Sequence, residues 1–193
     1  MKRYIKFLLI FAIALVFIAL TGIQVTMAQD SNGNAGDNGT QKLSKQERLA
    51  KNKQQILDII QKKDFVLESN FIQNKYGYRW FINPLFNFVM VNGDTATVQL
   101  SFNHLPGWNG VGGITWKGVI DQYKVSPGKP HSPIFVQMHV QGAGIASSQF
   151  LTVDADGNAD LNINGDYGGQ VTFTGNLMPI DKSNVIEGHA TNN

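Results

Sequence analysis

The segment DADGNAD, residues 154–160, carries three aspartates that could bind a cation. Carboxylates at spaced loop positions beside a glycine are ligands that Ca²⁺ prefers, so Asp154, Asp156 and Asp160 are a candidate calcium site. A complete calcium loop needs a bidentate Glu at its twelfth position, which here is Gly165. An Asp-Gly pair at a hairpin tip explains the same residues without a metal, and we favour that turn.

Residues that could support catalysis are few and scattered. The four histidines, at positions 104, 131, 139 and 189, lack the short spacings of metal ligands, and the chain has no cysteine. No nucleophile elbow, zinc-protease helix or cofactor-binding motif is present, so we expect no cofactor. A hydrolase whose site is assembled only in space remains an alternative.

Trp108 lies in the glycine-rich segment PGWNGVGGITWKG, residues 106–118, where no strand alternation places it in a core. An exposed loop tryptophan can stack on sugars or peptides. We favour instead a tryptophan that folds back to plug a barrel mouth, because apolar surface is stabilised by burial. A phosphate site is disfavoured because these glycines lead into a predicted strand and not into a helix N-terminus.

The same short pattern occurs twice, as GGITWKG at 112–118 and GGQVTFTG at 168–175. In each copy the residues on one strand face read large, large, glycine, large. A glycine in the middle of a packed strand marks a bend or a close backbone approach. We therefore predict structural roles in two curved strands for Gly112, Gly113, Gly118, Gly168, Gly169 and Gly175.

The first 28 residues have the pattern of a secretory signal peptide, with a basic start, an apolar run at 7–20 and the ending TMA. Their removal lowers the net charge from +2 to −1, because they contain Lys2, Arg3 and Lys6 and no acid. We predict a periplasmic or secreted protein with no membrane-spanning segment after cleavage. A chain so close to neutral gives no reason to expect nucleic-acid binding.

Residues 29–42 are rich in Gly, Asn and Asp and predict a flexible linker, and residues 183–193 predict a disordered tail. Between them, 43–182 form one predicted domain. Ser44 and Glu47 have capping-box spacing at the start of a basic amphipathic helix, 43–64.

From residue 65 onward the apolar residues alternate with a period of two, which predicts antiparallel strands. The expected fold is mainly β: an N-terminal helix, then a curved antiparallel sheet of about eight strands, barrel-like, with a β-sandwich as second choice. A ninth strand is possible at 170–178.

An ordered series of segments resembles the bacterial secreted proteins grouped as domain of unknown function 4251, over about residues 45–180. After the helix, the segments that carry the resemblance are DFVL (64–67), NGDTATVQL (92–100), GVGGITWKGVIDQYKV (110–125), FLTVDADGNADL (150–161) and VTFTGNLMP (171–179). The resemblance implies an exported β-rich domain and lends no catalytic residues.

Taken together, these features predict a non-catalytic binding or interaction domain of the cell envelope, with a partner or small ligand that the sequence does not identify. A barrel that carries a small apolar ligand is one alternative, and the hydrolase is another. A carrier needs a hollow interior, whereas Trp116 and Phe173 are large enough to fill a small barrel.

Overall fold

The computed structural model describes residues 44–102 and 107–191. The predicted signal peptide and linker, and His104, lie outside these residues. These described residues form one compact unit. No helix in the described part of the chain is long and apolar enough to cross a membrane.

In the described residues the long helix is α2 (Lys45–Lys62), and capping residues in the sequence fix both of its ends. The Ser44 hydroxyl accepts a hydrogen bond from the Glu47 backbone N–H, and the Glu47 carboxylate accepts one from the Ser44 N–H, which forms the predicted capping box. Lys63 adopts a left-handed conformation (φ 55°) and ends the helix. Ile56 and Ile60 are buried on the face of α2 that joins the core.

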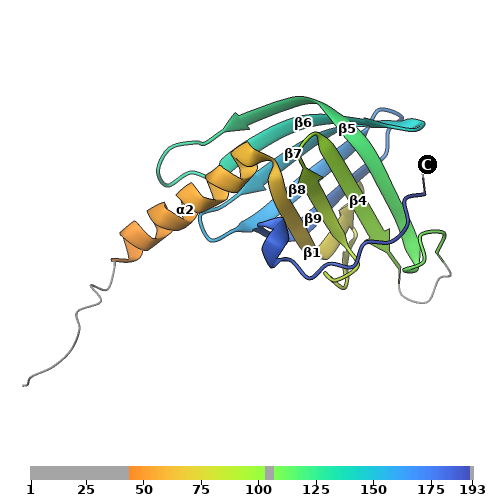
Figure 1. Cartoon of the computed structure of the whole chain (residues 1–193), viewed down its shortest axis with the longest axis horizontal. Coiled ribbons are helices and arrows are strands. Elements are labelled where there is room, and N and C mark those ends of the chain that lie inside the picture. The colour runs from red at the N-terminus through yellow and green to blue at the C-terminus, as the bar shows by residue number, and fades with distance from the viewer. Residues whose placement is uncertain (1–43, 103–106, 192–193) are drawn as a thin grey trace, which may run out of the picture. The chain divides into compact units, whose positions relative to one another are not determined.

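Nine strands follow α2 in the part of the chain that the structure describes, and eight of them form a closed antiparallel barrel (Figure 1). Each barrel strand pairs with the next along the chain, and the last pairs with the first over eight residue pairs from Val66–Met178 to Asn74–Val171. The mainly-β barrel prediction is therefore confirmed. The strands are β1 (Asp64–Asn74), β2 (Arg79–Phe81), β3 (Phe88–Asn92), β4 (Thr95–Ser101), β5 (Gly113–Ser126), β6 (Ile134–Gly142), β7 (Ile145–Val153), β8 (Asn158–Gly165) and β9 (Gln170–Met178).

The core lies inside the barrel and is built by alternation. On β6, the inward residues Ile134, Val136, Met138 and Val140 are all at most 2% exposed, as the period of two predicts. Ile114 departs from the prediction and is half exposed, because it lies near the start of β5, at the end of the barrel that α2 does not cover.

The two ends of the barrel differ. At one end, α2 is attached to the barrel: the Tyr123 hydroxyl donates to the Ile60 carbonyl at 2.8 Å, and the Lys53 ammonium donates to the Lys129 and Ser132 carbonyls. The other end, here called the mouth, is formed by the described residues 75–87, 102, 107–112, 143–144 and 166–169, which lie between strands on the side away from α2. The mouth has no covering helix in the described part of the chain.

The paired glycines behave as the repeated pattern predicts, with one exception. A β-carbon on Gly118 would come within 2.7 Å of the Gln141 carbonyl, and one on Gly175 would collide with the Glu68 carbonyl, so both mark close backbone approaches. Gly113 likewise has no room beside Leu100, whereas Gly112 and Gly168 adopt positive φ of 90° and 89° in the turns. Only Gly169 is free of both constraints.

The chain's C-terminal segment, residues 183–191, lies along the outside of the barrel (Figure 1). Its backbone N–H groups at Ile186 and Thr191 donate to the carbonyls of Leu85 and Thr115. The prediction of a disordered tail is therefore wrong for 183–191. The polar composition of this segment suggested disorder, but hydrogen bonds to the rest of the fold hold it in place without buried apolar side chains of its own.

Candidate functional site: an aromatic-rimmed cavity at the barrel mouth

The mouth contains a cavity of about 480 Å³ that reaches into the barrel. This volume lies within the range of small-molecule sites, about 300–1,000 Å³. Most of the cavity wall is apolar, and its polar members are uncharged. The lining residues are Ile72, Asn74, Trp80, Phe81, Ile82, Asn83, Leu100, Ser101, Phe102, Gln170 and Val171.

The hairpin of β1 and β2 places two aromatic side chains on the cavity. Trp80 is the register partner of Ile72, and Phe81 that of Phe71. The Asn74 side-chain oxygen accepts from the backbone N–H groups of residues 76 and 78, which fixes the turn between the two strands. Phe81 packs edge-on against Phe71 with 5.4 Å between ring centroids.

Buried amide side chains fix the rest of the mouth. Asn87 donates to the Asn83 carbonyl at 2.9 Å and accepts from the Ser101 backbone N–H at 2.8 Å, so segment 82–87 is joined to the end of β4. The Ser101 hydroxyl donates in turn to the Val111 carbonyl at 2.6 Å. These bonds, one of them fully buried, join the lining residues Asn83 and Ser101 to neighbouring segments and so preorganise part of the cavity wall.

Exposed aromatic side chains gather at this end of the molecule. They come from the turns and strand ends of the mouth and give it an amphipathic rim, since tyrosine and tryptophan combine an apolar body with a polar group. The rim residues are Tyr76, Tyr78, Trp80, Phe81, Phe102, Trp108 and Tyr167.

Trp108 is 92% exposed, so the prediction that it plugs the barrel is wrong. The neighbouring residue explains why. Asn109 is fully buried, accepts from the N–H groups of Val111 and Gly113, and donates to the Thr115 hydroxyl at 3.0 Å. Because the side chain of Asn109 is buried against β5, the side chain of the preceding Trp108 lies in solvent.

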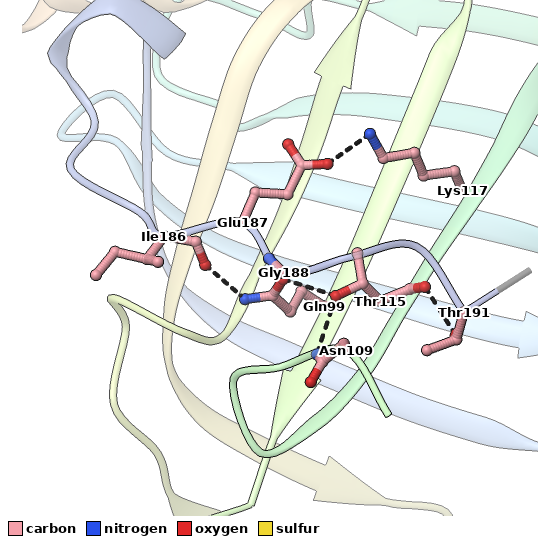
Figure 2. A network of polar contacts seen from close by, with 8 residues as sticks. All are labelled: Gln99, Asn109, Thr115, Lys117, Ile186, Glu187, Gly188 and Thr191. Carbon is pink, nitrogen blue, oxygen red and sulfur yellow. Dashed lines mark hydrogen bonds and ion pairs between the residues drawn. The ribbon is translucent and has the colours of Figure 1, made fainter. Parts of the chain in front are cut away.

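Figure 2 shows that Asn109 belongs to a buried network on the outer faces of β4 and β5. The Thr115 hydroxyl donates to the Gln99 side-chain oxygen at 2.7 Å, and that oxygen also accepts from the Gly188 N–H. The Gln99 amide nitrogen donates to the Ile186 carbonyl at 2.8 Å. The loop that carries Trp108 is thus tied to the C-terminal segment through Gln99.

The three candidate calcium ligands do not converge. Both oxygens of the Asp154 carboxylate are occupied by the turn, accepting from the backbone N–H groups of Asp156 and Asn158 and from the Asn158 amide. Asp160 instead accepts from the Thr174 hydroxyl on β9. No cluster of three potential metal ligands occurs in the residues that the structure describes. The segment is the predicted hairpin turn.

One polar cluster on the outer face of the barrel was not predicted from the sequence. The His139 ring lies between two carboxylates, with Nδ1 2.8 Å from Asp121 and Nε2 3.8 Å from Asp166. Ser148 is the cross-strand partner of His139, which brings a Ser-His-Asp set onto three adjacent strands. The ring nitrogens face the two carboxylates, however, so this set does not have the geometry of a nucleophile activated by a base.

A second hollow, of about 420 Å³, lies between α2 and the turn at 155–157. It carries four charged side chains, Asp58, Lys62, Asp156 and Lys182, and no aromatic residue. The mouth cavity is therefore the better candidate for a ligand site.

These features define a class: a helix-capped, eight-stranded antiparallel barrel with an apolar cavity at its open end. The chain belongs to the DUF4251 family, a domain of unknown function, whose model matches residues 47–177. It is similar to the crystal structure of a DUF4251 family protein from Bacteroides eggerthii DSM 20697, with 34% sequence identity and a TM-score of 0.58 over 72% of this chain and 95% of that one. No curated protein matches the chain.

Proposed function

We propose that this chain is an exported, non-catalytic binding domain that takes a small apolar ligand, or the apolar part of a larger one, into the mouth cavity. The observation that carries the proposal is the cavity of about 480 Å³, walled by apolar side chains from β1, β2, β4 and β9. A ligand that covers these apolar side chains would remove their surface from water, which favours binding.

The fixed mouth supports the same proposal. Asn74, Asn87 and Asn109 hold three mouth segments in place by side-chain to backbone hydrogen bonds. The described residues held by these bonds lose little freedom when a ligand enters, which lowers the entropic penalty of binding.

The proposal is tested with N-phenylnaphthylamine, a neutral probe that fluoresces in apolar sites. We expect saturable fluorescence with the protein and its loss in Val171→Phe, which fills the cavity. Val119→Phe is the matched control, because Val119 is exposed on β5 and lies outside the cavity lining. Equal probe binding by the two variants, both folded, would reject the mouth as the site.

Export is part of the proposal and rests on the signal-peptide pattern of residues 1–28. Intact-mass analysis of protein recovered from its source should give a chain that begins at Gln29, in a soluble envelope or extracellular fraction. A chain that retains residues 1–28 in a membrane fraction would contradict this.

A second candidate function is recognition of an envelope polymer by the outer rim. Trp108 and Tyr167 are 92% and 90% exposed, and the neighbour of Trp108, Asn109, is held by a hydrogen bond from the Gly113 N–H. A fixed, solvent-facing indole is suited to stacking on a sugar or peptide. Quenching or a blue shift of tryptophan fluorescence by oligosaccharides, lost in Trp108→Ala while probe binding is kept, would favour this function over the cavity.

A further inference from the structure

The short strand β2 leaves one of its edges open at the mouth. β1 pairs with β9 along most of its length, with β3 over Asp64–Glu68 and with β2 over Phe71–Gln73, so β3 and β2 follow one another along the same edge of β1. β3 continues the barrel wall to β4. Among the described residues β2 has no strand on its other side, so the wall is interrupted there.

The register identifies the backbone groups on this open edge. The Ile82 N–H donates to the Asn70 carbonyl at 2.9 Å, and in an antiparallel pair the residues that bond to the partner alternate with residues that face away from it. Arg79 and Phe81 therefore direct their N–H and C=O groups away from β1. Within residues 44–102 and 107–191 these groups have no hydrogen-bond partner.

The mouth cavity lies along the interrupted part of the wall. It is lined both by β2 and by the end of β4, two strands that do not pair with each other. At the end of β4, the Ser101 N–H is bonded to the Asn87 side chain and not to a strand. Trp80 is the register partner of the buried Ile72, so the face of β2 that carries Trp80 is the face toward the cavity.

This arrangement selects the chemistry of a ligand. Backbone N–H and C=O groups at strand spacing are matched by another extended polypeptide backbone, which can add to the sheet as a further strand. Every second side chain of such a peptide would lie on the same face as Trp80, over the cavity. No charged residue belongs to the cavity lining, so apolar side chains are favoured at those positions. The exposed ring of Phe81 would be partly covered by the remaining side chains.

We infer that the mouth binds an extended peptide segment, which adds to the open edge of β2 through its backbone and inserts alternate apolar side chains into the mouth cavity. This inference rests on the proposed function, since it names the larger ligand whose apolar part the cavity takes. β2 is only three residues long, so backbone pairing and side-chain insertion are both needed for binding.

The test uses a short, end-capped peptide in which leucine alternates with threonine, labelled with a fluorophore for anisotropy. Two further versions carry N-methyl groups, one on the leucines and one on the threonines. An edge strand bonds through the N–H groups of every second residue, so we expect one methylated peptide to bind at least about ten-fold more weakly and the other to bind like the parent. The peptide cannot escape by shifting one residue, because its leucines would then face away from the cavity.

Variants of the protein test the two contacts separately. Arg79→Pro removes one N–H from the open edge without removing a bond to β1, and proline is tolerated on edge strands. It should weaken peptide binding by about ten-fold and keep the binding of N-phenylnaphthylamine. Arg79→Ala is the matched control and should keep both. Val171→Phe, which fills the cavity, should lose both.

The outcomes separate this inference from the proposed function. If neither the probe nor the peptide binds to the wild-type chain, the proposed function fails. If the probe binds and the peptide does not displace it, the cavity remains and the peptide is the wrong ligand. The inference is also overturned if both methylated peptides bind like the parent, if both lose binding, or if Arg79→Pro and Arg79→Ala bind the parent equally. Should Arg79→Pro lose the probe as well, the methylated peptides decide, because they are used with the wild-type chain.

Discussion

The indole ring of Trp116 on β5 lies directly against Gly142 at the end of β6: a β-carbon on Gly142 would come within 2.7 Å of the ring. The ring also approaches Gly118, two residues further along its own strand. A large side chain in a narrow barrel is thus accommodated by glycines on its own and the neighbouring strand, which couples strand curvature to core packing.

Gly118→Val and Gly175→Val are expected to destabilise the fold by about 2 kcal/mol or more, because a branched side chain has no volume at either position. Gly175→Val should be the more severe, since its β-carbon meets the rigid Glu68 backbone, whereas Gly118 also faces side chains that can move. Gly169→Val is the control, because its β-carbon meets nothing within 4 Å. Urea unfolding in which all three variants match the wild type would refute this role of the glycines.

Gln99→Ala is expected to lower the free energy of unfolding by about 2–3 kcal/mol, because it leaves Thr115 and the backbone at 186–188 without buried partners. The variant should also increase amide hydrogen exchange at residues 186–191. Gln137→Ala, at an exposed position, should change neither quantity. Faster exchange in both variants, or in neither, would show that Gln99 does not hold the C-terminal segment.

Asp154→Ala should destabilise the fold by about 1 kcal/mol, since the carboxylate accepts three hydrogen bonds within the turn. Millimolar Ca²⁺ should shift the Tm of the wild type by less than about one or two degrees, because a ligand stabilises in proportion to its binding to the folded state. Thermal unfolding with Ca²⁺ or with EDTA measures both. A rise of several degrees in Ca²⁺ that Asp154→Asn removes would restore the calcium site.

Tyr123 gives the fold a defined dependence on alkaline pH. Burial raises the pKa of Tyr123 above its ordinary value of 10.0. The folded state therefore holds the Tyr123 proton more tightly than the unfolded chain does. This contribution to the free energy of unfolding is complete below pH 10.0 and is lost as the pH rises above that value. Tyr123→Phe loses the hydrogen bond to Ile60 and should be less stable at neutral pH by about 0.5–1.5 kcal/mol.

The difference between Tyr123→Phe and the wild type should therefore shrink above pH 10.0. Urea unfolding at neutral pH and at several alkaline values measures it, with Tyr167→Phe, at an exposed position, as the control. A difference that stays constant across this range would show that the Tyr123 hydroxyl ionises as readily in the folded as in the unfolded chain.

Local patterns predicted the elements well. The Ser44–Glu47 spacing placed the start of α2, the alternation on β6 placed its inward residues, and the repeated glycine pattern identified two strands with close backbone approaches. These features depend on neighbours in the chain, and a sequence displays them directly.

The site depends on contacts between distant residues and was predicted less well. Trp80 and Phe81 line the cavity only because β2 pairs with the end of β1, although the aromatic run YGYRWF at 76–81 was a visible signal. Trp108 was misplaced because the burial of its neighbour Asn109 depends on Thr115 in the following strand. The order of segment 183–191 depends on Gln99, about 90 positions earlier.

The pairing of β1 with β9 has a consequence for how the chain reaches its fold. Val66 and Met178 meet across more than half of the sequence, so the barrel closes only when its last strand is available. Non-local pairing of this kind slows folding, and until β9 is available, both β1 and β8 present open edges on which other chains can add strands. Chains truncated before residue 170 should therefore aggregate, and a factor that shields strand edges during synthesis should increase the yield of native protein.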